Sequence, residues 1–592
     1  MKLIFGSDSR RGSSIVVVLV LCSITLLILG SALQWSSTNT TLSQRNNEYF
    51  KTIAVAEGAT EKLLSRIVAD YRKDGEVTVL ANTNSYKDFV PTSSDNALLA
   101  KYEFSDGQGH TDKMFVQYDG PTVYKVLDGH YKDLHGYATP FRIISNAKQL
   151  DSLFQVVGAV RQDFELSTIP LFQFAIFYNL DLEIAPGADM EITGPVHSNE
   201  DVYIDPGEAL TFRSDVTAAG NIYESSKYGS TSNDGTVDWG PTHKSKASSL
   251  NLPIGTTNTA AAVREVVEVP PSGESATSDL GKQRFYNRAD MIIRIKANKQ
   301  VQVTSGLANN FATIIPRSSW DKASNANTGF LTTNASFFNK REGKTVTPIE
   351  INVAKLALWN VSTNNTLKSY LTNEGGAGNL RMVYVVDERA HGVNTESGVR
   401  LVEGKVLLPK GLTVATPNPL YVQGDYNTGT NLSPASHATL SKGTTNTAYT
   451  RPAALIGDAI TILSGKWKDS DSTKELTQRK PEDTTVNAAF LAGIVETTNS
   501  LYSGGVENFP RFLEDWGGTF TYNGSMVVMY PSKYAIGDWG GTGEDIGIYN
   551  APVRKWAFDK NFSSYDKLPP GTPMIRGVIR GKWSAIAANT GP

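Results

Sequence analysis

The pattern of hydrophobic and polar positions starts with a long apolar run. Residues Ile15–Leu33 are almost all apolar, and no charged residue occurs anywhere in residues 12–44. Nineteen residues of α-helix span roughly 28 Å, which is close to the thickness of the hydrocarbon core of a bilayer. Lys2, Arg10 and Arg11 precede the run. This positive flank is predicted to stay in the cytoplasm, with everything after the run outside.

Two other interpretations of this run also predict export. Gly30, Ser31 and Ala32 supply the small residues of a signal-peptidase site, so a cleaved secretory signal is one alternative. Ser9, Arg10 and Arg11 resemble the start of a twin-arginine signal, although the residues that follow fit that pattern poorly.

A second helical pattern continues directly from the apolar run. Between Leu42 and Tyr71, mostly apolar residues recur at steps of three and four, which predicts one apolar helix face. They are Tyr49, Ile53, Ala56, Thr60, Leu63, Leu64, Ile67 and Tyr71. No proline occurs before Asp74, so an unbroken helix is predicted from Ser13 to about Lys73. A cleaved signal does not need such a continuation.

The order of these N-terminal segments carries a family resemblance. A basic leader ends in Gly12, the hydrophobic run follows at once, and Ile53–Ile67 continues it with small residues and Glu. About residues 10–75 therefore resemble the N-terminal segment of PilX-type minor pilins and related type IV pilus assembly proteins. The resemblance implies that a prepilin peptidase cuts between Gly12 and Ser13, and that the exposed helix then packs into a pilus or pseudopilus core.

Two positions depart from the pattern of the major pilins. Those proteins carry Phe at the first mature position and Glu at the fifth, where this chain has Ser13 and Val17. PilX-type members and the K-type minor pseudopilin often lack that Glu, so the departure argues against a major subunit more than against the family. An ordinary signal anchor that holds an unrelated ectodomain is the alternative.

Beyond Lys73 the pattern is typical of short strands. Three apolar runs, Val77–Leu80, Met114–Tyr118 and Thr122–Leu127, are separated by Gly, Asp and Asn turns. Ala147–Arg161 is predicted to be a helix, and Leu171–Tyr178 a buried strand.

An internal repeat follows, with an offset of twenty residues. Leu182–Val202 aligns with Val202–Ile222, so that the Pro-Gly pair at Pro186 falls on the one at Pro206 and the apolar positions coincide. This pattern is typical of coils in a parallel β-solenoid, where the inward side chains of each coil pack on the next. Similar strands separated by turns occur at Leu412–Asn427, Ala454–Trp467, Ala488–Thr497 and Thr519–Tyr530.

The predicted fold is mainly β with a long N-terminal α-helix, and its ectodomain is a parallel β-helix (solenoid) with an inserted α/β segment. A β-sandwich is the alternative fold. The predicted segments are the basic leader 1–12, the transmembrane and amphipathic helix 13–75, a small mixed segment 76–170, a first solenoid part 171–225, an insertion 226–405 that opens with a Ser/Thr/Gly-rich loop, and a second solenoid part with the C-terminal region 406–592.

Composition removes several classes of function. Lys and Arg number 56 against 59 Asp and Glu, so the chain as a whole has no electrostatic basis for binding nucleic acid. Cys22 is the one cysteine, which excludes an intrachain disulfide and a thiolate zinc cluster.

The tripeptide that starts at Arg294 occurs in pectin-cleaving glycosidases, but the other motifs of those enzymes are missing here. Glu514 and Asp515 are neighbours in the sequence and are predicted to point apart on a strand, so they do not form a catalytic pair. We expect no enzyme, cofactor or metal site.

These observations predict a minor pilin-like component of a type IV pilus or pseudopilus, whose large extracellular β-domain serves assembly or adhesion. The expected partners are the inner membrane, other pilin-like subunits, the prepilin peptidase, and a surface or polysaccharide ligand. The predicted localisation is a single-pass membrane protein of the bacterial cell envelope with a periplasmic or extracellular ectodomain. The alternative is a membrane-anchored β-helix protein that binds or cleaves polysaccharide, which clustered carboxylates on one solenoid face would favour.

Overall fold

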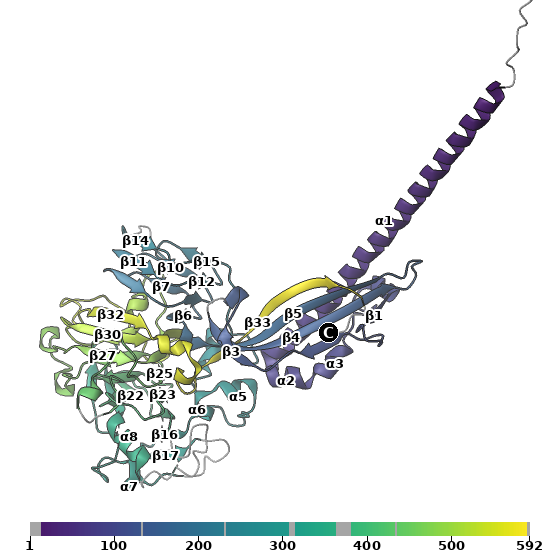
Figure 1. Cartoon of the computed structure of the whole chain (residues 1–592). Helices are drawn as coiled ribbons and strands as arrows, with labels where there is room; N and C mark the ends of the chain where they lie inside the picture. The colour runs from purple at the N-terminus through teal and green to yellow at the C-terminus, as the bar shows by residue number, and fades with distance from the viewer. Residues whose placement is uncertain are drawn as a thin grey trace, which may run out of the picture.

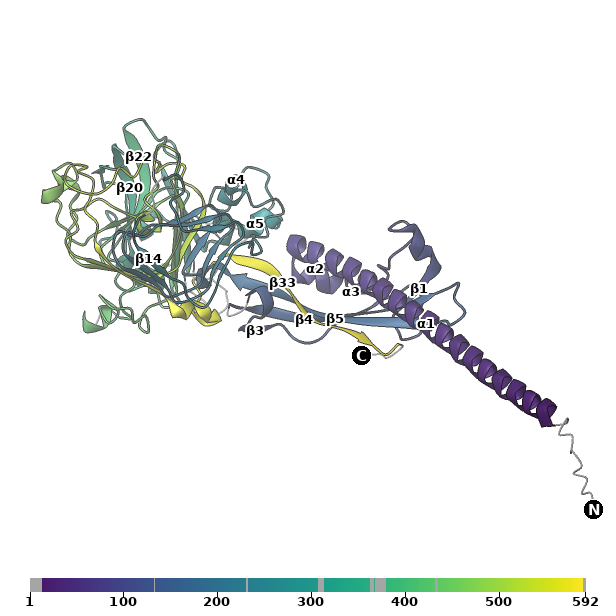
Figure 2. The same cartoon turned by 90° about the horizontal axis from the view of Figure 1, so that it is seen from above.

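Helix α1 runs unbroken over Ser13–Asp74, as the sequence predicts, and its N-terminal part protrudes far from the rest of the molecule (Figures 1 and 2). The computed structural model describes residues 13–131, 134–229, 233–306, 314–362, 367, 380–431 and 435–588. The apolar side chains of Ile15–Leu33 contact no other described part of the chain and are exposed.

The C-terminal half of α1 packs on an antiparallel sheet. The order of the main strands is β1 (Tyr102–Ser105), β4 (His135–Gln149), β5 (Val157–Pro170) and β33 (Met574–Ile586), with β2 (Phe115–Tyr118) and β3 (Val123–Val126) also paired to β4. The helix buries the apolar face that its sequence predicts, including Leu63 and Ile67, against Phe141, Val160 and Phe164. We call α1 through β5 together with β33 the stalk.

Two local predictions are wrong in the stalk. Residues Ala147–Arg161, predicted as a helix, instead end β4 and begin β5. Here Ala147 and Val160 are buried in the apolar cluster shared with α1, so tertiary packing overrides the local helical pattern. Val77–Leu80, predicted as a strand, lies in the short helix α2 (Glu76–Ala81), which α3 (Thr83–Lys87) follows.

Backbone contact between α1 and β5 requires a glycine at position 158. A Cβ there would lie 2.6 Å from the backbone nitrogen of Ile53 and 2.7 Å from the carbonyl carbon of Thr52. Gly158→Ala is therefore expected to force the helix off the sheet and to destabilise the stalk by about 1–3 kcal/mol, measured by thermal unfolding followed by circular dichroism at a helix wavelength. The matched control is Gly58→Ala on an open face of the same helix; equal stability of the two variants would contradict the prediction.

The remaining residues, 171–573, form a head made mostly of parallel strands (Figure 1). Its largest sheet has eleven strands, in which all pairs except β16 with β17 are parallel. In spatial order they are β15 (His243–Lys244), β12 (Val216–Ala218), β9 (Val196–Ser198), β6 (Ile176–Tyr178), β31 (Met526–Pro531), β28 (Ala489–Ile494), β25 (Ala453–Gly457), β23 (Leu412–Ala415), β21 (Met382–Asp387), β16 (Met291–Ile295) and β17 (Val301–Ser305).

Four smaller sheets complete the head. A seven-stranded sheet contains β18 (Leu331–Thr332), β20 (Lys344–Asn352), β22 (Thr395–Val402), β24 (Leu420–Gln423), β26 (Ile460–Leu463) and β29 (Pro510–Phe512), with β19 (Phe337–Asn339) paired to β20. Three parallel sheets of three strands are β7 (Leu182–Ile184), β10 (Val202–Ile204) and β13 (Ile222–Tyr223); β8 (Met190–Ile192), β11 (Ala209–Phe212) and β14 (Thr236–Asp238); and β27 (Thr484–Asn487), β30 (Thr519–Gly524) and β32 (Val553–Phe558).

Helices in the head are short. The α-helices are α4 (Ala260–Arg264), α5 (Asp279–Gln283), α6 (Phe285–Arg288), α7 (Arg317–Trp320) and α8 (Val353–Val361). The last of these overlaps Ile351–Leu358, whose sequence pattern is typical of a helix. Single 3-10 turns include η2 (Gly129–Tyr131), η3 (Leu171–Gln173), η8 (Val506–Asn508) and η9 (Lys560–Ser563).

The twenty-residue repeat of the sequence matches the register in which neighbouring strands pair. Each strand residue of the first unit pairs in parallel with the residue twenty positions later; the pairs include Ile184 with Ile204, Met190 with Leu210, Ile192 with Phe212, Val196 with Val216, and Val202 with Ile222. The turn repeats as well, since the N–H of Gly207 donates to the carbonyl of Pro186 at 2.8 Å.

The chain enters the large sheet in its middle. It starts at β6, adds β9, β12 and β15 in one direction, crosses the molecule through residues 245–290, and resumes at β16 near the opposite end. The strands from β21 to β31 then return, and β31 pairs with β6. Pairing therefore continues across residue 405, the predicted end of the insertion, because β21 pairs with β23 and β22 with β24.

Apolar residues fill both sides of the large sheet. One cluster lies inside the head and includes Leu182, Leu210, Val414 and Phe490. A second cluster covers the other face, where residues of the crossing segment pack on alternate residues of the strands. Burial on both faces explains why strands such as β25 are continuously apolar.

Candidate functional site

Of the two residues at the predicted processing site, the structure describes Ser13, at the protruding end of α1. Gly12 is outside the described residues, and Ser13 is the first residue of the helix. Helix α1 is the one helix in the described chain that is long and apolar enough to cross a membrane.

Polar side chains within the apolar run are satisfied by the helix itself. The hydroxyls of Ser23, Thr25 and Ser31 donate to the carbonyl oxygen four residues earlier, at 2.7–2.8 Å. Such bonds leave no unpaired hydroxyl donor in an apolar environment, which suits a lipid bilayer or a packed helix bundle.

Strand β33, the last strand of the chain's described part, contacts the C-terminal half of α1. Arg576 on β33 donates to the carbonyls of Tyr71, Arg72 and Lys73 at 2.9–3.2 Å and so caps the C-terminus of α1. Arg580 forms a bidentate ion pair with Glu61, at 2.6 and 2.9 Å. Strand β33 follows the head in the chain and pairs with β5, the strand that leads into the head. The head is therefore joined to the stalk by two neighbouring, hydrogen-bonded strands.

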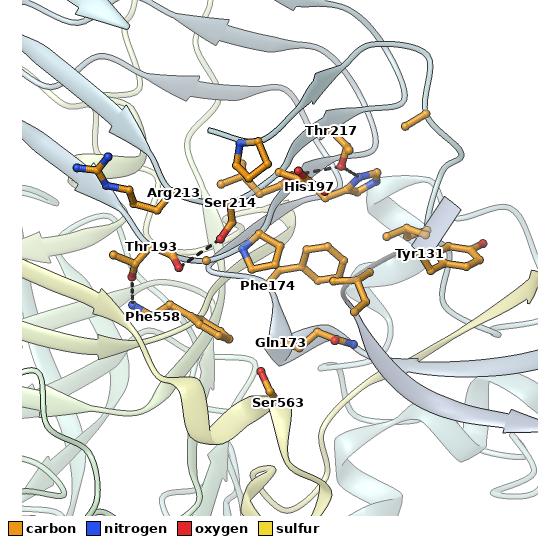
Figure 3. Close-up of a pocket in the computed structure, with 18 of the residues that line it drawn as sticks. Tyr131, Gln173, Phe174, Thr193, His197, Arg213, Ser214, Thr217, Phe558 and Ser563 are labelled. Atoms are coloured by element: carbon orange, nitrogen blue, oxygen red, sulfur yellow. Dashed lines mark hydrogen bonds between the residues drawn. The ribbon is translucent and has the colours of Figure 1, made fainter. Parts of the chain in front are cut away.

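A pocket of about 420 Å³ lies where head and stalk meet (Figure 3). Its walls are lined by Tyr131 from the stalk, Phe174 between η3 and β6, His197 from β9, and Phe558 from β32. Lys244, Lys560 and Arg213 also line it, together with several hydroxyl groups.

The polar groups at the back of this pocket already bind one another. His197 is buried, and its two ring nitrogens hydrogen-bond to Thr217 Oγ1 at 2.8 Å and Asn199 Oδ1 at 3.0 Å. Burial lowers the pKa of His197 to about 4, so the ring is neutral near pH 7. Gln173 is likewise held by the backbone of His135 and Pro170. The arrangement supports a structural junction rather than a reaction centre.

Candidate catalytic residues from the sequence have structural partners. Glu514 accepts from the backbone N–H of Ser464 at 2.6 Å and from its hydroxyl at 2.7 Å, and burial raises the pKa of Glu514 to about 7. Asp515 instead contacts Asn550 and Lys480. Arg294 donates to Glu388 at 2.8 Å. Among the described residues, no group of three or more His, Cys, Asp or Glu side chains is placed to hold a metal ion.

Sequence reasoning missed the junction pocket because its walls come from distant segments. One signal was available: His197 and Thr217 are twenty residues apart, so the repeat places them on neighbouring strands, where they pair in register. No such relation links Tyr131 or Phe558 to them.

Comparison with known proteins adds no assignment: no family model matches the chain, no curated protein matches it, and no solved structure matches it.

Proposed function

We propose that this chain is a minor pilin-like structural component of a type IV pilus or pseudopilus, and that its head is presented at the cell surface for assembly or adhesion. The observation that carries the proposal is the division of the 62-residue helix α1 into two halves. Its first part is apolar and exposed, whereas its second part is buried on an antiparallel sheet.

The boundary between the two halves of α1 lies near Glu48, a buried residue whose carboxylate accepts from the N–H of Val156 at 2.9 Å. The apolar run Ile15–Leu33 before it is exposed, so it is free to be stored in a membrane and then to pack among other helices. An ordinary signal anchor has no need for a helix that continues for a further 26 residues, to Asp74, along the sheet.

The head acts as a rigid display domain, and its parallel sheets are the faces of a β-solenoid. In-register stacking at a constant offset supports this architecture. So do rows of Asn side chains at equivalent corners: Asn199 donates to Asn179 at 2.8 Å, and Asn523 donates to Asn487 at 2.7 Å. Under this proposal, much of the predicted insertion 226–405 consists of further coils.

Mass spectrometry of the mature N-terminus from the membrane or sheared-fibre fraction tests the pilin-like function. The expected N-terminal residue is Ser13, because the prepilin-type leader would be removed after Gly12. A Gly12→Leu variant, which would block that cleavage, is expected to retain Met1.

Two results would contradict the pilin-like function. A mature chain that starts at Leu33 would mean a released ectodomain, and an intact Met1 in the native protein would mean a simple membrane anchor. Ala32→Leu is the matched control, since it alters the signal-peptidase alternative and leaves the Gly12 site unchanged.

A further inference from the structure

A groove of about 380 Å³ lies on the face of the head formed by β7 and β10. Its other walls are the stretch Ser226–Gly229 and the turn Thr497–Tyr502, which is closed by a hydrogen bond from the N–H of Thr498 to the carbonyl of Leu501 at 2.8 Å. None of its lining residues belongs to the junction pocket of Figure 3.

Tyrosine rings provide flat apolar surfaces in and beside this groove. Tyr203 stacks on Tyr223 of the next strand, with ring centroids 5.1 Å apart and planes at 14°. Tyr228 is 53% exposed, and the ammonium group of Lys227 lies 5.4 Å from the centroid of its ring. The coil repeat creates the first pair, because Tyr203 and Tyr223 occupy the same position in successive coils.

Carboxylates line the same groove. Asp205 is buried and accepts from the N–H of Asn233 at 2.7 Å through Oδ1, while its Oδ2 accepts no hydrogen bond from the described chain. Glu183 accepts from Ser503 Oγ at 3.3 Å. Lys227 is the one cationic side chain among the described residues lining the groove, and it is paired with Asp181 at 2.7 Å. The groove therefore offers acceptors and carries negative charge.

We propose that this groove binds an uncharged oligosaccharide. The C–H faces of sugar rings pack on tyrosine rings, and sugar hydroxyls donate to carboxylate oxygens, which are acceptors only. A groove of this size is typical of small-ligand sites. Acidic sugars are excluded because Glu183 and Asp205 line the groove, whereas its single lysine, Lys227, is already paired with Asp181, and like charges repel.

This inference goes beyond pilus assembly and involves no bond cleavage. Glu507, which lies under the groove near Glu183, is buried at 4% exposure and is out of reach of a ligand. The groove thus offers Glu183 and Asp205 as acceptors for binding.

Calorimetric titration of the full chain in lipid nanodiscs tests the inference. Nanodiscs avoid detergents with sugar headgroups, which would compete for the groove. The probes are cellohexaose, maltohexaose, N-acetylchitohexaose and, as the acidic counterpart, hexagalacturonate. We expect at least one neutral probe to bind and hexagalacturonate not to bind.

Variants then locate the site. Tyr228→Ala removes an exposed ring and is expected to weaken binding about tenfold, whereas Tyr449→Ala removes a comparably exposed ring outside the groove and is expected to have no effect. Binding of only the acidic probe, binding of no probe, or binding unchanged by Tyr228→Ala would each overturn the inference. None of these results bears on the N-terminal residue, so the pilin-like function is tested separately.

Discussion

Replacement of Asp458 by Ala is expected to destabilise the head by about 3–5 kcal/mol. The carboxylate is fully buried and accepts from Arg264 Nη1 at 2.6 Å. It also accepts from three successive backbone N–H groups at 2.7–2.9 Å, those of Lys533, Tyr534 and Ala535. In the variant, the buried guanidinium of Arg264 and three backbone N–H groups lose this acceptor. The free-energy cost of those buried donors is far larger than the net contribution of the Asp458–Arg264 ion pair itself.

Urea unfolding of the full chain, followed by tryptophan fluorescence, measures this loss, because seven of the nine tryptophans lie in the head. The control is Glu191→Ala, which breaks an exposed pair with Arg213 and is expected to cost less than about 1 kcal/mol. Arg264 belongs to the crossing segment, so Asp458→Ala is also expected to speed proteolysis within residues 245–290. Equal stability of the two variants would refute this account of the ion pair.

Local sequence patterns predicted those parts of the fold that depend on neighbours in the chain or on a fixed offset. The apolar face of α1 and the pairing of Val196 with Val216 are of this kind. The contact between β6 and β31 is not: Asn179 donates to the carbonyl of Met529, 350 residues away. Nothing in either segment marks the other as its partner, since both are simply apolar.

The groove likewise combines one feature that the local sequence predicts with one contact that it does not predict. The stacked Tyr203 and Tyr223 follow from the twenty-residue repeat, but the turn at Thr497–Tyr502 comes from a segment almost 300 residues later in the chain. It reaches the groove because β28, just before the turn, pairs with β31, which in turn pairs with β6. A sequence analysis without this topology cannot place the two segments together.

Glu507→Gln is expected to leave the stability of the head nearly unchanged at pH 4.5 and to raise it by about 3 kcal/mol at pH 8. Glu507 lies in the turn η8, where its Oε1 accepts from the N–H of Ala185 at 3.0 Å and its Oε2 has no partner in the described chain. Burial raises the pKa of Glu507 to about 7, although Arg554 nearby acts in the opposite direction.

The direction of the effect follows from proton binding. Between about pH 4.5 and pH 7 the unfolded chain has lost this proton while the folded chain keeps it, so the stability of the native protein falls as pH rises through this window. Glutamine resembles the protonated acid, retains the acceptor for Ala185 and has no proton to lose. The stability difference between variant and native chain should therefore grow from pH 4.5 to pH 7 and then stay constant.

Urea unfolding of both chains at pH 4.5, 6, 7 and 8 gives this difference directly, because pH effects from other groups, such as the buried His197, occur in both chains and cancel. Glu544→Gln is the matched control, since that side chain is exposed and its replacement should give no pH-dependent difference. A difference for Glu507→Gln that is the same at pH 4.5 and pH 8 would mean that Glu507 titrates alike in the folded and unfolded chains. Burial would then not control its charge.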